Sequence, residues 1–266
     1  MKDLTYCILG NGFVFLMTCV GVAIVFFFRK NKKPVFQTVF LGFAAGVMIA
    51  VAVFGLLMPA IENAAKNGSA MSWLPAALGF IGGALFLFFL DKIIPHIHPL
   101  MDVKEGINTN MKRSTLLVCA ITIHNIPEGI AIGLSFALAA QNPADSTLLS
   151  SAIALTLGIG IQSFPEGVAV SLPLRYAGMS SGKAFTIGIL SGLVRPISGI
   201  AVFAIAGLIE PIMPYSLSFA AGAMMYVVVE ELIPEVHYNK HSNIGTIAVL
   251  FGFVLMMVLE TVLSEV

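Results

Sequence analysis

The sequence predicts an all-α polytopic membrane protein of eight transmembrane helices, arranged as an inverted repeat with both termini outside. Three observations lead to this fold class: an apolar composition, eight runs long enough to cross a bilayer, and two pairs of similar segments. The chain has 266 residues, of which 58% are hydrophobic and 11% charged, and its mean hydropathy is +0.96. Soluble domains carry about 25% charged residues, so a soluble globule is excluded.

Charge and cysteine content narrow the function classes. The formal net charge is zero and the chain has no basic patch, so no nucleic acid partner is expected. Cys7, Cys19 and Cys119 lie in apolar runs without paired spacing. They indicate neither a disulfide framework nor a thiolate cluster, and we expect no prosthetic group.

The apolar runs, taken in order, nearly exhaust the chain. A transmembrane helix needs about 20 apolar residues. The first run ends in Arg29-Lys30 and is too long for a signal peptide, so we interpret it as a span that is kept. The predicted spans are 4–28, 35–61, 73–94, 114–140, 147–174, 184–209, 213–236 and 244–263. Residues 1–266 therefore form a single transmembrane domain, with 95–112 as a loop between the third and fourth spans.

Basic residues in the connecting loops predict the orientation, because lysine and arginine accumulate on the cytoplasmic side. On one side lie Arg29, Lys30, Lys32, Lys33, Lys92, Lys104, Lys112, Arg113, Arg175, Lys183 and Lys240. Only Lys2 and Lys66 fall on the other side. The 95–112 loop is therefore cytoplasmic and both termini face outward.

Two pairs of segments repeat. FAAGVMIAVAVFGLL, from Phe43 to Leu57, aligns without gaps to FAAGAMMYVVVEELI, from Phe219 to Ile233. HNIPEG in the fourth span likewise matches QSFPEG in the fifth. In the predicted topology the two members of each pair run in opposite directions. Inverted repeats in transporters place the substrate site near the bilayer midplane, where the halves meet.

The HNIPEG and QSFPEG motifs carry ligand chemistry. His124 and Glu128 are four residues apart and project from one face of a helix; Gln162 and Glu166 repeat that spacing. A carboxylate inside the membrane costs on the order of 2.5–3.5 kcal/mol and needs a partner, for which a divalent cation is suited. Histidine mixed with glutamate and an amide favours Zn, Fe, Mn or Cd over Mg or Ca.

The prolines of the motifs predict interruptions of both helices. Pro127 and Pro165 each remove a backbone donor, which would free the carbonyl groups of Ile123 and Ile161 to line a cavity. The alternative is that polar residues serve as interhelical hydrogen bonds and the prolines as simple kinks. Two copies of the motif, together with Arg195 and the Glu230-Glu231 pair, favour a site. Weaker candidates, interpreted as solvated histidines or packing methionines, are His96, His98, His237, His241, Met48 and Met224.

With these spans, outward termini, a histidine-bearing third loop and the paired PEG motifs, the chain resembles the ZIP (Zrt/Irt-like) family of divalent metal transporters, in its bacterial form. The resemblance implies a 3+2+3 helix bundle in the cell membrane and no enzymatic activity. It also implies uptake of Zn²⁺, or of Cd²⁺, Fe²⁺ or Mn²⁺, toward the cytoplasm. On this reading the whole of 1–266 is a transport domain.

The resemblance also implies roles for particular residues. By position, His124, Glu128, Gln162 and Glu166 match the primary metal site. Asn125 and Glu166 match a neighbouring second site, and Glu231 matches the usual acidic residue of the seventh span.

Two departures from the family pattern concern the second site. Ser163 stands where aspartate, histidine or asparagine is common, and Arg195 stands where a glutamate is common. We therefore expect the Arg195 guanidinium to occupy the place of a second metal, paired with Glu166 or Glu231 by charge-assisted hydrogen bonds, so that one ion is bound. The alternative is that Arg195 faces a water-filled vestibule and repels cations.

Other functions stay open from the sequence. A secondary transporter of a small organic substrate is the main rival, whereas an intramembrane metalloprotease would need a motif such as HExxH, which is absent. A homodimer is compatible with the sequence but not indicated by it. Because a metal competes with protons for His124 and the carboxylates, metal binding should weaken as the pH falls from about 7 toward 5.

Overall fold

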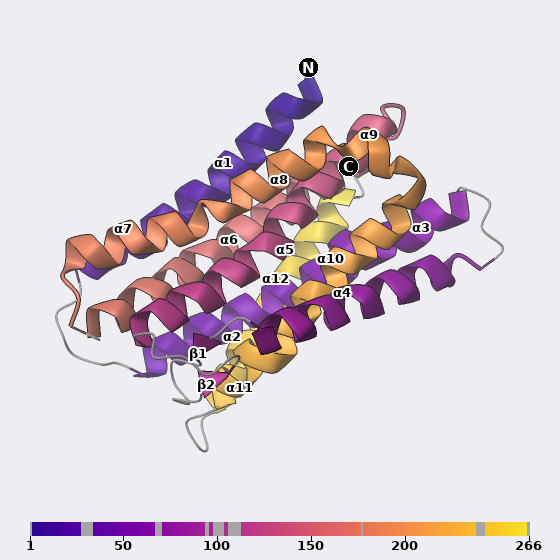
Figure 1. The fold of residues 1–266 in the computed structure, drawn as a ribbon. Coiled ribbons are helices and arrows are strands. Elements are labelled where there is room, and N and C mark those ends of the chain that lie inside the picture. Colours follow the sequence, from indigo (N-terminus) through magenta and orange to yellow (C-terminus); the bar gives the residue numbers. More distant parts are fainter. Residues whose placement is uncertain are drawn as a thin grey trace.

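A computed structural model describes residues 2–27, 34–66, 71–93, 96–97, 104–105, 113–176, 178–237 and 243–264. These residues are almost entirely helical (Figure 1). The exception is a short antiparallel pair, β1 (His96–Ile97) with β2 (Lys104–Glu105), inside the segment expected to be a loop. The all-α polytopic fold is therefore confirmed.

Eight helical spans in the described residues are long and apolar enough to cross a membrane, as expected. They are built from α1 (Lys2–Ala23) with the 3₁₀ turn η1 (Ile24–Phe26); α2 (Pro34–Ala50), η2 (Val51–Leu57) and α3 (Met58–Lys66); α4 (Trp73–Ile93); α5 (Arg113–Gln141); α6 (Ser146–Tyr176); α7 (Ser181–Gly192) and α8 (Val194–Ala204); α9 (Ala206–Ile209), η3 (Glu210–Ile212), α10 (Met213–Val227), η4 (Val228–Leu232) and α11 (Ile233–His237); and α12 (Asn243–Ser264).

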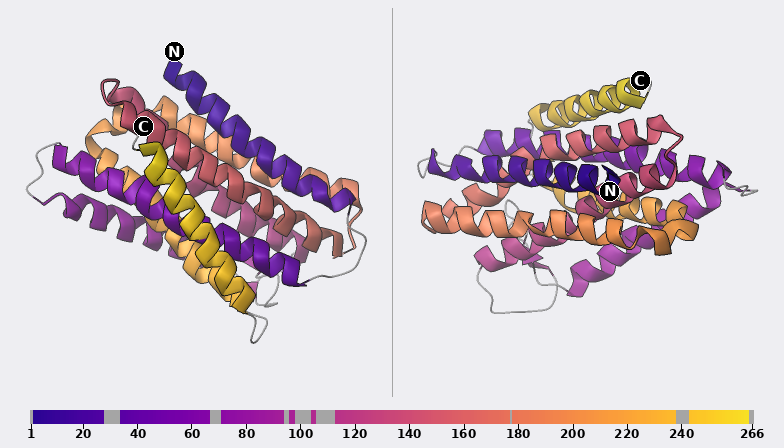
Figure 2. Two further views of the ribbon diagram at one scale, coloured as in Figure 1. Left: turned by 180° about the vertical axis from the view of Figure 1, so that it is seen from behind. Right: turned by 90° about the horizontal axis from the view of Figure 1, so that it is seen from above.

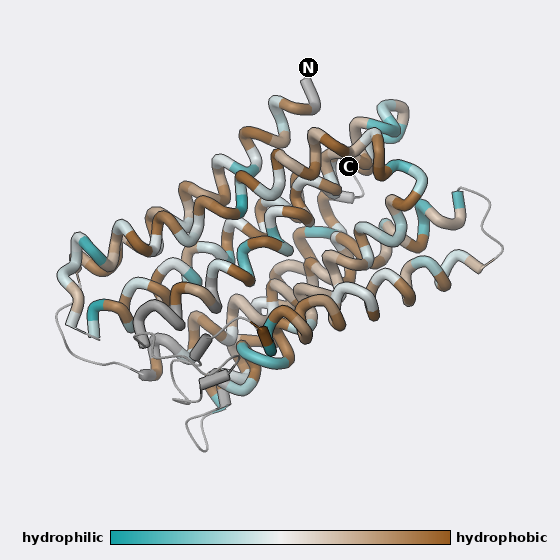
Figure 3. Tube along the Cα trace, viewed as in Figure 1, coloured by the Kyte–Doolittle hydropathy of each residue, from teal (hydrophilic) through white to brown (hydrophobic). Residues whose placement is uncertain are grey.

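The eight spans are apolar in composition, and Figure 3 shows brown, hydrophobic colour recurring along the helices between paler stretches. Many large apolar side chains are exposed, including Leu9, Phe251 and Leu208. Such a surface is suited to lipid rather than water. The chain is therefore a multi-pass membrane protein.

The helices form one elongated bundle, and the N- and C-termini lie at the same end of it (Figures 1 and 2). α5 packs against α6 in the middle, α1 packs on α6, and α8 packs on α5. On the other flank α2 pairs with α12 and α4 pairs with α10. Which end of the bundle faces the outside stays a prediction, as does the 3+2+3 inverted repeat.

The two flanking helix pairs use equivalent glycines of the repeated FAAG segments. A Cβ atom on Gly46 of α2 would overlap the carbonyl oxygen of Val249 on α12, and one on Gly222 of α10 would overlap that of Phe80 on α4. Small residues allow helix backbones to approach closely in membranes, where packing rather than hydrophobicity drives association. The same local sequence therefore makes the same kind of helix contact twice.

Helix irregularities occur elsewhere than expected. α5 and α6 are continuous through Pro127 and Pro165, so the prediction that the motif helices are broken is wrong. A single proline removes one donor, and a helix can kink there without ending. Irregular segments include instead the π-helical η2 and η4, which fall at matching places in the repeated segments, and the interruption at Leu193 between α7 and α8.

Candidate metal centre

The motif side chains meet where α5, α6, α8 and η4 come together in the interior of the bundle. α5 contributes His124, Asn125 and Glu128; α6 contributes Gln162, Ser163 and Glu166; the first turn of α8 contributes Arg195; and η4 contributes Glu231. Most of these side chains are nearly inaccessible, and the least buried of the acids, Glu166, is 16% exposed. Polar groups at this depth require partners within the protein.

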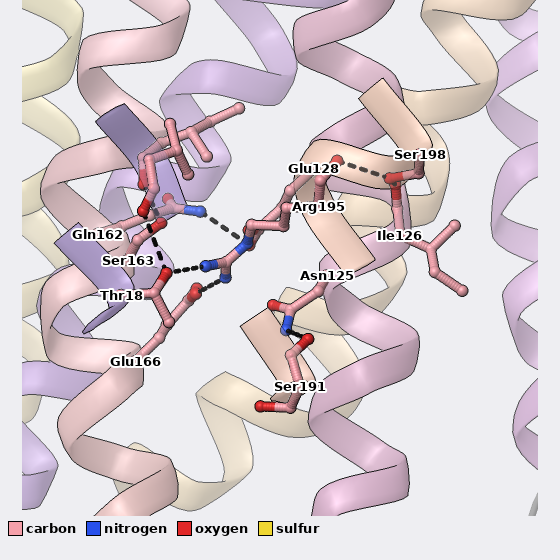
Figure 4. A network of polar contacts seen from close by, with 12 residues as sticks. Thr18, Asn125, Ile126, Glu128, Gln162, Ser163, Glu166, Ser191, Arg195 and Ser198 are labelled. Atoms are coloured by element: carbon pink, nitrogen blue, oxygen red, sulfur yellow. Dashed lines mark hydrogen bonds and ion pairs between the residues drawn. The ribbon is translucent and has the colours of Figure 1, made fainter. Parts of the chain in front are cut away.

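Arg195 holds the centre of the network (Figure 4). Its Nε forms an ion pair with Glu128 Oε2, and its Nη2 donates to Glu166 Oε2. Its Nη1 donates to Thr18 Oγ1 of α1 at 2.7 Å. The side chain is 1% exposed, so the guanidinium is enclosed by groups from three helices. Of the two expected alternatives, Glu166 or Glu231, the structure has Glu166, and it adds Glu128, which was not expected.

Glu128 also joins the two motif helices directly. Gln162 Nε2 donates to Glu128 Oε1 at 3.0 Å, and both side chains are buried. Among the described residues none donates a hydrogen bond to Gln162 Oε1. A buried amide oxygen without a donor is unfavourable unless a cation or water faces it. Gln162 thus presents an unused oxygen beside a carboxylate.

The remaining two metal-capable groups form their own pair. His124 Nε2 contacts Glu231 Oε1, which connects α5 to the π-helical segment η4. Their side chains are 14% and 12% exposed. The contact holds a hydrogen between Nε2 and Oε1, so these two atoms can bind a cation only once that proton has left.

Two positions matched to a second metal make other contacts. Asn125 Nδ2 donates to the carbonyl oxygen of Ser191 at 2.8 Å, and Ser163 Oγ donates to that of Ile159. Each side chain therefore satisfies a backbone acceptor, on α7 and within α6 respectively. Neither contacts Arg195 through a described hydrogen bond.

Thr18 belongs to this network although the sequence did not single it out. A threonine inside an apolar helix usually bonds to a carbonyl one turn earlier, and Thr18 Oγ1 does donate to Val14 O at 3.1 Å. Its contact with Arg195 joins residues 177 apart, close to the 176-residue offset of the repeat. That offset was the only available signal, and it requires extending the repeat to the first and sixth spans.

The described residues contain no group of three or more His, Cys, Asp or Glu side chains arranged to hold a metal ion. A cation would therefore have to draw ligands out of the pairs described above. Met48 and Met224 lie in the apolar core, as expected of packing residues. The side chains of His96, His98, His237 and His241 lie outside the described residues.

Comparison with known proteins identifies relatives over nearly the whole length. Residues 4–113 and 100–260 match the family described as ZIP Zinc transporter. The zinc transporter ZIP11 of Homo sapiens is 35% identical over 95% of this chain and 96% of its own length. The zinc transporter ZIPB of Bordetella bronchiseptica is 36% identical over 97% of this chain and 82% of its own length. The zinc transporter ZupT of Streptococcus mutans is 36% identical over 91% of this chain and 92% of its own length.

Proposed function

The chain belongs to the ZIP family of zinc transporters, and from this premise we propose that it carries Zn²⁺ across a membrane toward the cytoplasm. Its relatives are named as zinc transporters, over nearly the full length of the chain. Cd²⁺, Fe²⁺ and Mn²⁺ suit the same mixture of imidazole, amide and carboxylate ligands. Transport would proceed by an elevator-like or rocking movement of α5 and α6 against the flanking helices.

One observation carries the proposal: the glutamates of the two PEG motifs, on different helices, contact a single guanidinium. Glu128 and Glu166 are therefore close enough to share one cation. His124 and Gln162 lie one turn away from these glutamates on the same helices, and Gln162 already bonds to Glu128. We propose that these four side chains form the primary site, with Glu231 able to replace or assist a ligand.

We further propose that the site takes a single ion. Arg195 lies against Glu166, the carboxylate that two adjacent ions would have to share. Asn125 and Ser163, the other candidates for a second site, bond to backbone oxygens. A positive guanidinium at this place repels a second cation by the same electrostatics that hold it to the carboxylates.

Within the part of the chain that the structure describes, one cavity bears on the alternative of an organic substrate, and it does not favour it. A cavity between α4, α5 and α10 has a volume of about 50 Å³ and an apolar lining that includes Phe86, Ile126 and Phe219. Sites for small organic molecules usually measure about 300–1,000 Å³ and contain placed polar groups. This cavity suits neither an organic substrate nor a metal.

The test combines transport with stoichiometry. Purified protein in proteoliposomes should take up radioactive zinc, and Glu166→Ala should abolish uptake, while Glu210→Gln, at an exposed glutamate of η3, should not. Equilibrium dialysis should give one tightly bound zinc for the wild type and two for Ser163→Asp combined with Arg195→Glu. Two midplane ions in the wild type would refute the single-ion site, and absence of zinc flux would refute the function itself.

A further inference from the structure

We propose that Arg195 is a tethered counter-ion: it takes the place of the metal between Glu128 and Glu166 whenever no metal is bound, and so allows the metal-free carrier to return. This inference rests on the proposed transport function. It assigns Arg195 a part in the transport cycle that is separate from limiting the number of bound ions.

The first support is that guanidinium and metal need the same atoms. The Oε2 atoms of both Glu128 and Glu166 contact Arg195, and Glu128 Oε1 is used by Gln162. A zinc ion that binds the Oε2 atoms of both carboxylates would displace Arg195 from at least one of them. The two cations are therefore alternative partners of one carboxylate pair.

The second support is the permanence of the charge. Arginine stays protonated throughout the physiological range, so Arg195 supplies its positive charge without any exchange with solvent. Both Arg195 and Glu128 are only 1% exposed, and a charge buried at that depth is strongly unfavourable without a partner. Arg195 compensates one of the two negative charges that Glu128 and Glu166 would otherwise carry unpaired after the metal leaves.

The third support is that the counter-ion is fixed to the site it serves. The carbonyl oxygen of Arg195 lies so close to Gly129 that a Cβ atom there would overlap it, and Gly129 directly follows Glu128. The Arg195 backbone is thus held on the motif helix α5, while its side chain spans to α6 and α1. If α5 and α6 move, Arg195 moves with them.

Transport kinetics follow from this placement. Net uptake requires the carrier to reorient both with and without metal, whereas exchange of external for internal metal requires only the loaded form to reorient. Loss of the Arg195 charge leaves the loaded form with its metal but leaves the unloaded form with two unpaired carboxylates in a medium of low dielectric constant. Net uptake should therefore be lost while exchange persists.

The experiment compares the two fluxes of radioactive zinc in the same proteoliposome preparation, with vesicles either empty or preloaded with unlabelled zinc. For Arg195→Gln we expect the ratio of net uptake to exchange to fall at least roughly tenfold below the wild-type ratio, as removal of one member of a buried ion pair implies. Arg195→Lys is the matched control: it keeps the charge and should keep the ratio within about twofold, even where a poorer fit lowers both fluxes.

Moving the positive charge to a neighbouring residue provides a second test that does not depend on the folding of Arg195→Gln. Thr18 already contacts the guanidinium at 2.7 Å, so Thr18→Lys combined with Arg195→Ser returns a cation to the pair from α1. This double variant should recover a ratio above that of Arg195→Ser alone. Net uptake and exchange falling in proportion in Arg195→Gln, a selective loss of net uptake in Arg195→Lys, or no recovery in the double variant would each overturn the inference. Absence of both fluxes in the wild type would instead refute the proposed function.

Discussion

Two helix crossings beside the site are alike in packing and different in charge. α1 crosses α6 where the Thr18 carbonyl lies against Gly167, and α8 crosses α5 where the Arg195 carbonyl lies against Gly129. Both glycines end a PEG motif. In each case the absence of a side chain lets a neighbouring helix approach to backbone contact.

The difference between the crossings lies in the side chain that each contributes to the polar network. At the α1 crossing it is a hydroxyl, which donates within its own helix and accepts from Arg195. At the α8 crossing it is a guanidinium that contacts both glutamates. The two crossings thus share a backbone arrangement, but only the α8 crossing supplies a permanent positive charge. That charge compensates Glu128 and Glu166.

The largest difference between the two crossings should appear when the side chains of Arg195 and Thr18 are removed one at a time. Arg195→Ala leaves two carboxylates without their cation and should destabilise the protein by about 3–5 kcal/mol. Thr18→Ala removes one hydrogen bond from the guanidinium but leaves both ion pairs of Arg195 in place, and should cost less, about 1.5–3 kcal/mol, as is usual for a hydrogen bond to a charged group. Thermal and denaturant unfolding in one detergent would measure both. Equal losses for the two variants would show that the crossings do not differ in the way described.

The common feature of the crossings can be tested at the glycines. Gly129→Ala and Gly167→Ala should each cost about 1–3 kcal/mol, because the new methyl group meets backbone atoms that cannot turn aside. Gly129→Ala should be the more severe of the two, since its Cβ would be closer to the opposing carbonyl oxygen. Gly12→Ala on α1 is the control: its Cβ would have nothing within 4 Å, and no loss is expected. Tolerance of alanine at both PEG glycines would contradict the close backbone contact.

The sequence predicted the spans and the residues that meet, because long apolar runs and i, i+4 spacing are local properties. From the need of a buried arginine for an anion, it predicted that Arg195 pairs with Glu166 or Glu231. It did not name Glu128, which is the second carboxylate on Arg195 in the structure. Glu231 contacts His124 instead, and this choice of partner depends on how deeply η4 lies relative to α5.

The incorrect expectation of broken motif helices has a related cause. Proline signals a lost hydrogen bond, but whether a helix ends there depends on the neighbours that hold both sides in line. α5 packs closely against α8 at Gly129, and α6 packs closely against α1 at Gly167. The π-helical turns of η2 and η4 had no signal in the sequence beyond the repeat, because insertion of one extra residue in a turn leaves the composition unchanged.

The smallest expected effect concerns the connection between the two motif helices. An exposed ion pair joins this connection to the end of α3. Lys66 at the end of α3 lies 2.7 Å from Asp145, which precedes α6, and the two side chains are 60% and 29% exposed. The hydrogen bond from Lys66, with a second from Thr147, lowers the pKa of Asp145 below its usual value. The resulting stabilisation is present above the ordinary aspartate pKa and is lost as the pH falls through the lowered one.

An exposed pair of this kind is worth about 0.2–1 kcal/mol and is screened by salt. Lys66→Ala should therefore lower the melting temperature slightly at neutral pH and low salt, and the difference from the wild type should shrink both in strong acid and in high salt. Lys183→Ala, at an exposed lysine of α7, serves as the control for loss of a surface charge. A deficit for Lys66→Ala that persists unchanged at low pH and high salt would mean that Lys66 acts through packing of its aliphatic chain. In that case the link between α3 and the motif helices would be of the same apolar kind as the glycine crossings, and the electrostatic asymmetry would be confined to Arg195.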